Sequence, residues 1–447
     1  MKGVSQMKQK KYKVTIVGGG STWTPGLLKS LCVKKEKLPL KELVLFDNNG
    51  ARQEPIGKFA QILFREENPE VEVIYTTDKE VAYKDVDYVF CQIRTGGFKM
   101  RELDEKIPLK YGVVGQETCG PGGFAYGLRS IPDMIEIVND VRKMSKDAWI
   151  LNYTNPAAIV AVALDQVFPD DKRLLNICDQ PINLLKSYGK IVNIDFHDLK
   201  PVYFGLNHFG WFKHLYNTEG VDLLPEIKEK ILKYGFDPAD KEERDPSWLD
   251  TYHMVKNILE NYPDYLPNTY LQYYLFPEYK VSHLNKDYTR ANEVMDGREK
   301  KVFTESKKVI ESGTAKNSPL AVNEAHADMI VDLASALANN TNEEFIMILR
   351  NEGTISNLPD DAMVEVNCVV GNIGPRKISV GNIPTFHKGL IEQQYAYEKL
   401  AAEAFFEKSY KKALAALTLN RTVIDGYKAK KILDELIVAN KGYWELL

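Results

Sequence analysis

VTIVGGGSTWTPG, residues 14–26, has the order of a buried strand, a glycine turn and the start of a helix. Glycine lets the backbone approach a pyrophosphate, and the free N–H groups at a helix N-terminus favour its negative charge. Asp47 ends the next apolar run, where a carboxylate can bind a ribose hydroxyl. We therefore predict a nucleotide-binding turn. Trp23 replaces the third glycine of the G-x-G-x-x-G pattern, so a purely structural turn is the alternative.

The first half of the chain continues this alternation of apolar runs and helical patterns. Runs rich in valine, isoleucine, leucine and aromatic residues predict strands at residues 13–17, 43–46, 71–75, 87–93, 149–153, 174–178 and 202–206. Strands that alternate with helices indicate crossover units and a mainly parallel sheet. We predict an α/β fold with a Rossmann-like, mainly parallel sheet domain over residues 11–200.

The second half, residues 201–447, predicts a mixed, mostly helical α+β domain that shares one active-site cleft with the first. Residues 222–262 are charged and mostly helical in pattern, and residues 263–285 are predicted to form an irregular loop over the site. Apolar residues at three- and four-residue spacing predict long helices over residues 316–351 and 389–447. Strands are expected between them, at residues 362–370 and 377–381.

Composition excludes several classes of protein. The 447 residues carry 58 Lys and Arg against 62 Asp and Glu, a net charge of −4, which argues against a generic nucleic-acid binder. Five scattered cysteines do not form a disulfide framework and favour a reducing cytoplasm. Residues 1–13 are lysine-rich but lead into no long apolar stretch, and residues 157–164 are too short to span a bilayer. We expect no signal peptide and no membrane association.

Unusual polar residues follow the predicted strands, at the end where parallel α/β sheets bind ligands. These positions are residues 18–20, 47, 94–97, 152–155, 178–179 and 207–208. The loop YGVVGQETCGPGGFAYG, residues 111–127, adds Gln116, Glu117 and Thr118 among six glycines. Such a loop suits close approach to a ligand, and a tight solvent-exposed loop is the alternative.

Cys178 and His208, at the ends of different strands, are candidates for a divalent-metal site. A small buried thiol and a hydrogen-bonded core histidine are the ordinary alternatives. Asp179 is a candidate general acid or a group that orients a metal ligand. One tyrosine of residues 266–277 becomes a base if a cation lowers its pKa, although packing is their usual role. Arg101, Arg290 and Arg298 are candidate anion binders with a surface role as the default.

Together these segments resemble the NAD-dependent, metal-dependent glycosidases of glycoside hydrolase family 4. The resemblance covers nearly the whole chain. It rests on six motifs in order: VGGGSTWTP (17–25), GQETCGPGG (115–123), LNYTNPAA (151–158), NICD (176–179), GLNHFGW (205–211) and TRANEVM (289–295). The family does not keep the third glycine, so Trp23 is no departure within it.

The resemblance implies hydrolysis without net redox change. Its steps are NAD-mediated oxidation at carbon 3 of the sugar, deprotonation at carbon 2, elimination, water addition and re-reduction. Within the family, Asp179 directly after Cys178, NTYLQYY at residues 268–274 and TRANEVM favour the branch that acts on α-linked 6-phosphoglucosides, such as maltose 6'-phosphate. The expected cofactors are NAD and Mn²⁺ or another divalent transition metal. A cytoplasmic homodimer or homotetramer is expected.

The resemblance also assigns roles to residues. Cys178 and His208 would bind the metal, Asp179 would donate a proton to the leaving group, and Tyr270 would be the base at carbon 2, with Glu117 close enough to raise its basicity. Tyr273 and Tyr274 are the nearest rivals to Tyr270. The residues expected to bind the substrate are Arg101, Asn155 and Arg290, with one or both arginines near the 6-phosphate. Those expected to bind the cofactor are Gly18, Gly20, Ser21, Thr22 and Asp47.

Three other activities stay open at this point. The same mechanism on 6-phospho-β-glucosides, α-galactosides or galacturonides changes only the sugar. A net NAD-dependent sugar dehydrogenase would accumulate NADH in step with its product. An inactive NAD-binding sensor would bind nucleotide without metal-dependent turnover.

Overall fold

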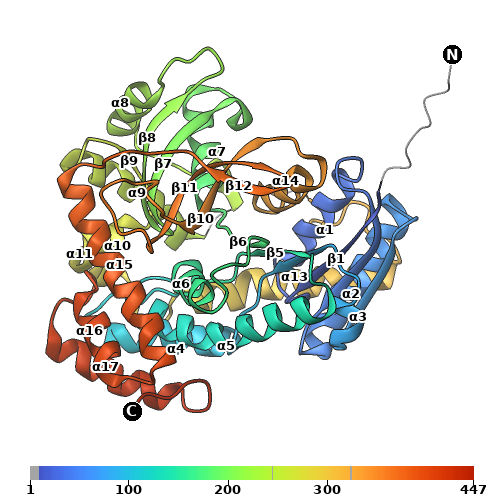
Figure 1. Cartoon of the computed structure of the whole chain (residues 1–447), viewed down its shortest axis with the longest axis horizontal. Helices are drawn as coiled ribbons and strands as arrows, with labels where there is room; N and C mark the ends of the chain where they lie inside the picture. Colours follow the sequence, from blue (N-terminus) through green and yellow to red (C-terminus); the bar gives the residue numbers. More distant parts are fainter. Residues whose placement is uncertain (1–9, 244, 323–324) are drawn as a thin grey trace.

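A nine-stranded sheet forms the centre of the molecule (Figure 1) in the computed structural model, which describes residues 10–243, 245–322 and 325–447. Its first six strands lie in the order β3-β2-β1-β4-β5-β6 and pair in parallel. They are β1 (Tyr12–Val17), β2 (Leu40–Phe46), β3 (Glu72–Thr76), β4 (Tyr88–Cys91), β5 (Trp149–Asn152) and β6 (Leu174–Asn176). This is the doubly wound order of dinucleotide-binding folds, whose ligands bind where the strand order reverses, here between β1 and β4.

Helices cover both faces of this sheet, which explains why its strands are near-continuous apolar runs. Leu43 and Leu45 pack with one face's helices, which are α1 (Thr24–Val33), α2 (Gly50–Glu67), α13 (Lys300–Ser312) and α14 (Ala325–Asn339). Val44 and Val89 pack toward the other face's helices, which are α3 (Lys79–Tyr83), α5 (Gly120–Met144) and α6 (Ala157–Val167). Two further helices, α4 (Gly97–Lys110) and α7 (Gln180–Val192), follow β4 and β6. The predicted Rossmann-like sheet is confirmed.

Three strands from the second half extend the same sheet beyond β6, drawn in orange in Figure 1. They are β10 (Glu343–Arg350), β11 (Met363–Gly371) and β12 (Gly374–Lys377), and all pair antiparallel. The predicted strand at residues 362–370 is confirmed, and the one at 377–381 lies earlier, at β12. Since both halves contribute strands to one sheet, the division near residue 200 stays a prediction.

The strand predicted at residues 202–206 exists as β7 (Lys200–Leu206), but its place in the parallel sheet was wrong. It belongs to a separate antiparallel sheet with β8 (Phe209–Tyr216) and β9 (Leu266–Pro267). Only Asn207 and His208 separate β7 from β8, and two residues are enough for a hairpin but not for a parallel crossover. The amide of Tyr203 donates to Asn367 Oδ1 on β11 at 2.8 Å, which docks this sheet on the main one.

The helix predicted over residues 316–351 was partly wrong, because β10 occupies its second part and residues 323–324 lie outside the described chain. Asn340 and Asn342 have φ values of 54° and 59°, left-handed conformations that asparagine tolerates and that end α14. The irregular loop predicted at 263–285 also contains two short helices, α10 (Leu271–Leu275) and α11 (Pro277–His283).

The remaining helical predictions are confirmed. Residues 222–262 contain α8 (Leu224–Tyr234) and α9 (Pro246–Asn261). The region predicted at 389–447 is covered by α15 (Thr385–Phe406), which begins four residues earlier, α16 (Tyr410–Leu419) and α17 (Gly426–Ala439). Short helical segments complete the chain: η1 (Phe196–Asp198), η2 (Lys241–Glu243), α12 (Arg290–Val294) and the π-helical turn η3 (Met295–Glu299). Within the described residues, no helix is both long and apolar enough to cross a membrane. The expectation that the chain has no signal peptide concerns residues 1–9, which lie outside the residues that the structure describes.

Glu398 on α15 is expected to make the protein less stable as pH rises. The side chain is 1% exposed, and burial raises its pKa from 4.5 to about 8, although a hydrogen bond from Gln394 Nε2 at 2.8 Å partly opposes this. The folded state therefore holds a proton that the unfolded chain releases between these two pKa values. We expect the free energy of unfolding to fall across that window by up to about 1.4 kcal/mol per pH unit from this group.

Glu398→Gln keeps the acceptor for Gln394 and has no proton to lose. Urea unfolding at pH 5.5 and pH 7.5 should give the variant a smaller loss of stability than the wild type. Equal pH slopes in the two proteins would contradict the assignment.

Candidate active site

A cavity of about 2100 Å³ opens at the carboxyl ends of the parallel strands and is lined by residues from both halves of the chain. The predicted shared cleft is therefore present. Every predicted site residue lines it: Gly18, Gly20, Ser21, Thr22, Asp47, Arg101, Glu117, Asn155, Cys178, Asp179, His208, Tyr270 and Arg290.

The glycine turn after β1 has the geometry that a bound dinucleotide requires. Gly18 has φ +83°, and a Cβ there would lie 2.7 Å from the carbonyl oxygen of Gln92. The Asp47 carboxylate is fixed because it accepts hydrogen bonds from the amides of Gly20 and Asn49, both at 2.9 Å. The chain then enters α1, and Pro25 and Gly26 in its first turn line the same cavity. This turn fits a pyrophosphate, with Asp47 placed for a ribose hydroxyl.

Cys178 and His208 come together from different sheets. Cys178 Sγ lies 3.4 Å from His208 Nε2, which is less than the sum of typical metal–sulfur and metal–nitrogen bonds, about 2.3 and 2.1 Å. One ion can therefore contact both atoms. The described residues contain no group of three histidine, cysteine, aspartate or glutamate side chains arranged around an ion, so further ligands would come from substrate or water.

The loop between β7 and β8 holds His208 in place. His208 has φ 120°, a conformation that costs energy for a non-glycine residue and occurs most often at functional sites. Thr118 Oγ1 lies 3.3 Å from Nδ1 of the ring, and the neighbouring Asn207 donates to Glu365 Oε1 at 2.9 Å. Burial lowers the pKa of His208 to about 4, so the imidazole is neutral at pH 7, as metal binding requires.

Tyr270 stacks on His208, with ring centroids 4.2 Å apart and planes inclined by 9°. Burial raises the pKa of its phenol well above the usual range, and neighbouring Tyr273 and Glu117 add to this. Of the rival tyrosines, Tyr273 also lines the cavity, whereas Tyr274 packs against Phe209 with ring centroids 4.7 Å apart. The geometry therefore places Tyr270 beside the candidate metal ligands.

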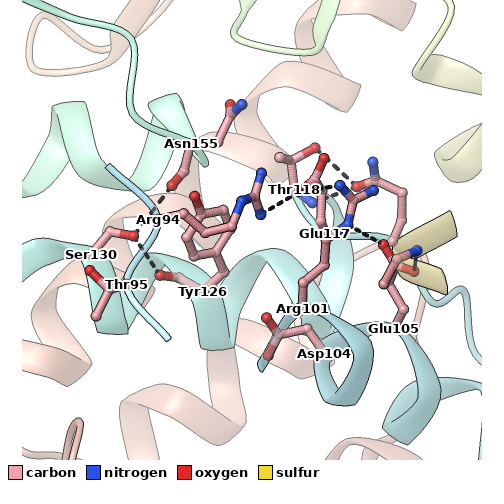
Figure 2. Close-up of polar contacts among 12 residues, drawn as sticks. Arg94, Thr95, Arg101, Asp104, Glu105, Glu117, Thr118, Tyr126, Ser130 and Asn155 are labelled. Carbon is pink, nitrogen blue, oxygen red and sulfur yellow. Dashed lines mark hydrogen bonds and ion pairs between the residues drawn. The ribbon is translucent and has the colours of Figure 1, made fainter. Parts of the chain in front are cut away.

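Glu117 lies between two arginines (Figure 2). Its Oε2 is 2.7 Å from Arg94 Nη1 and 3.2 Å from Arg101 Nη1, while Arg101 Nε donates to Glu105 Oε1 at 2.8 Å. Burial alone would raise the pKa of Glu117, but Arg101 and Arg94 lower it to about 2. The carboxylate is therefore ionised at any physiological pH. Glu105 also accepts the amide of Ala291 at 2.7 Å, which ties α12 to α4.

The remaining predicted residues surround the same space. Asp179 Oδ2 accepts a hydrogen bond from Asn183 Nδ2 at 3.0 Å, and its Oδ1 lies 3.9 Å from Cys178 Sγ. Arg290 is paired with Asp245 and lies 2.9 Å from Glu293. The backbone carbonyl of Asn155, which follows β5, accepts from Ser130 Oγ at 3.3 Å (Figure 2).

The sequence analysis placed Arg94 at the ligand-binding end of the sheet, within residues 94–97, but gave it no role. Its place in the loop between β4 and α4, at the carboxyl end of that strand, was the signal. Thr118 belonged to the glycine-rich loop already selected, but only the fold brings it to His208. Thr118 and His208 are 90 residues apart in the sequence, so no local sequence pattern could predict their contact.

Comparison with known proteins identifies the family. Residues 13–194 match the model described as Family 4 glycosyl hydrolase, and residues 203–423 match the model of the Family 4 glycosyl hydrolase C-terminal domain. A phospho-α-glucosidase of Clostridium acetobutylicum is 51% identical over 98% of this chain and 100% of its own length. A 6-phospho-β-glucosidase of Thermotoga maritima is 33% identical over 97% of this chain and all of its own.

Two solved structures share the fold over nearly the whole chain. A 6-phospho-α-glucosidase from gut microorganisms in complex with NAD and Mn²⁺ has a TM-score of 0.96 and 56% identity, covering 98% of this chain and 100% of that one. A second, in complex with NAD and glucose 6-phosphate, has a TM-score of 0.94 and 42% identity with the same coverage. With both halves matched by family models and relatives aligned from end to end, the chain belongs to glycosyl hydrolase family 4.

Proposed function

We propose that this protein hydrolyses α-linked 6-phosphoglucosides, such as maltose 6'-phosphate, to glucose 6-phosphate and the released aglycone, with NAD and a divalent metal such as Mn²⁺ as cofactors. One observation carries the proposal: a single cavity is lined by a dinucleotide-type turn, the Cys178–His208 pair and the buried Tyr270. The higher identity to phospho-α-glucosidases than to a phospho-β-glucosidase supports the α linkage.

The proposed chemistry uses both cofactors and a small set of side chains. When bound, NAD supplies reversible oxidation of the sugar at carbon 3, and the metal supplies Lewis-acid stabilisation of negative charge. Cys178 and His208 would hold the metal. The residues that would hold the dinucleotide, with its pyrophosphate toward the start of α1, are Gly18, Gly20, Ser21, Thr22 and Asp47.

Tyr270 is the proposed base at carbon 2. Its ring stacks on His208, so a cation held by His208 would lie near the phenol and would favour its ionised form, against the effect of burial. Asp179 is the proposed acid, which passes a proton to the glycosidic oxygen as that oxygen leaves carbon 1. Its position next to Cys178 supports an acid that acts on the same sugar as the base.

The substrate is held by Arg101, Asn155 and Arg290 in this proposal. Glu117 keeps Arg101 in place and lies near enough to Tyr270 for its charge to act on the phenol. We further propose that the protein works as a homodimer or homotetramer in the cytoplasm.

Activity assays separate this proposal from its rivals. With Mn²⁺, an aryl α-glucoside 6-phosphate should be hydrolysed many times over with NAD⁺ present only in catalytic amount, because the cofactor returns to its oxidised form. Accumulation of NADH in step with product would indicate a net dehydrogenase. Side-by-side assay of the β-linked and non-phosphorylated glycosides should show weaker turnover. Preference for either of these would overturn the proposed substrate.

A further inference from the structure

Arg298 lines the same cavity as the glycine turn, and none of the roles proposed above uses it. It lies in the π-helical turn η3, and its Cζ is 4.2 Å from the centre of the Trp23 ring, next to the start of α1. Its Nε is buried and has no hydrogen-bond partner. Among the described residues, no carboxylate forms an ion pair with it.

The other arginines that line the cavity in the described chain are all compensated. Each has a carboxylate partner: Arg52 with Glu299, Arg94 with Glu117, Arg101 with Glu105 and Glu117, and Arg290 with Asp245 and Glu293. Arg298 therefore differs from them, because its donors remain available for a ligand. A buried donor without a partner costs free energy, which a ligand that accepts from it would recover.

The surroundings of Arg298 favour an anion. Burial and the nearby charges of Arg101 and Arg290 together lower the pKa of Arg298 to about 9, since both disfavour the protonated form. A dianion bound here would offset both effects. A guanidinium group presents its donors as a planar fork that matches two oxygens of a phosphate.

We propose that Arg298 binds the 6-phosphate of the substrate sugar; this inference rests on the proposed function. The proposed function already assigns the dinucleotide pyrophosphate to the glycine turn and the start of α1. Arg298 follows Arg290 in the same segment of the chain, and Arg101 and Arg290 lie close enough to affect its charge. Because these two are neutralised by carboxylates, they suit the uncharged sugar hydroxyls, and Arg298 suits the phosphate.

The test compares Arg298→Gln and Arg298→Lys with Lys300→Gln, which removes an exposed positive charge from the adjoining helix. Calorimetric titration of the full-length protein, loaded with NAD⁺ and Mn²⁺, gives the affinity for glucose 6-phosphate. We expect Arg298→Gln to weaken it about 10- to 100-fold. Arg298→Lys keeps the charge but not the fork and should lose less. Lys300→Gln should stay within about twofold, as is usual for single exposed charges.

Two further measurements locate the effect. KM for an aryl α-glucoside 6-phosphate should rise with the loss of affinity, while kcat changes little, because Arg298 is assigned to the phosphate and not to the reacting carbons. NAD⁺ affinity, titrated separately, should be unchanged. Thermal melting tests whether each variant is folded. If Arg298→Gln does not fold, the affinity measured for Arg298→Lys tests the role of Arg298 instead.

The outcomes distinguish this inference from the proposed function. Wild-type protein that binds no glucose 6-phosphate would overturn both. Wild-type binding with equal affinity in a folded Arg298→Gln variant would overturn only the role of Arg298. Weakened NAD⁺ binding with unchanged glucose 6-phosphate affinity would also overturn it, because it would assign the guanidinium to the dinucleotide.

Discussion

Tyr270→Phe is expected to abolish exchange of the carbon 2 hydrogen of the sugar with solvent deuterium. Phenylalanine keeps the ring that stacks on His208 but has no oxygen to accept the proton. A positioned base contributes about 10²- to 10⁴-fold to such a step, so turnover should fall by a similar factor. The measurement is proton NMR of glucose 6-phosphate incubated in D2O with the enzyme, NAD⁺ and Mn²⁺.

Tyr273→Phe is the matched control for this variant. Tyr273 lines the same cavity and is similarly buried, but it is not stacked on His208. Exchange should continue in Tyr273→Phe at close to the wild-type rate. If exchange persisted in Tyr270→Phe and disappeared in Tyr273→Phe, the base would be Tyr273.

Cys178→Ser is expected to lose Mn²⁺ affinity while it folds normally. A serine hydroxyl rarely ionises and is a poor substitute for a thiolate ligand. Removing a side chain that hydrogen-bonds to a metal ligand typically weakens metal binding about 10- to 100-fold. Removing the ligand itself should weaken Mn²⁺ binding by at least the same factor. Titration of Mn²⁺ by electron paramagnetic resonance measures this affinity directly, and activity should fall with it.

Cys368→Ser controls for the loss of a buried thiol. Cys368 lies on β11, outside the cavity, and its Sγ donates to the carbonyl of Phe345 at 3.4 Å, a bond that serine can also make. Mn²⁺ affinity should be unchanged in this variant, and NAD⁺ affinity should be unchanged in both. Full Mn²⁺ affinity in Cys178→Ser would refute the assignment of Cys178 as a ligand.

The parallel part of the fold was predictable because its signals are local. The glycine turn at residues 18–20 follows a fully buried strand, and each later strand of this sheet is an apolar run followed by polar residues. The antiparallel additions were harder. In β10, the run Phe345 to Leu349 is apolar throughout, so its spacing suits a helix as well as a strand, and only pairing with β6 and β11 decides between them.

The candidate site was predictable where a residue with a suitable side chain follows the carboxyl end of a strand, as Asp47 and Cys178 do. Contacts between distant segments were not. Thr118 reaches His208, and Glu105 accepts the amide of Ala291, only because the β7–β8 hairpin and α12 fold over the parallel sheet. Which arginines keep free donors depends on where Glu117, Asp245 and Glu299 lie in space. That Arg298 has no carboxylate partner within the described residues therefore could not be read from the sequence.

A crystal structure of this protein with NAD⁺, Mn²⁺ and glucose 6-phosphate tests the central claim most directly. We predict that the ion contacts Cys178 Sγ and His208 Nε2, that the nicotinamide faces carbon 3 of the sugar, and that the Tyr270 hydroxyl faces carbon 2. A sugar bound away from the Cys178–His208 pair, or a nicotinamide directed into another part of the cavity, would contradict the account.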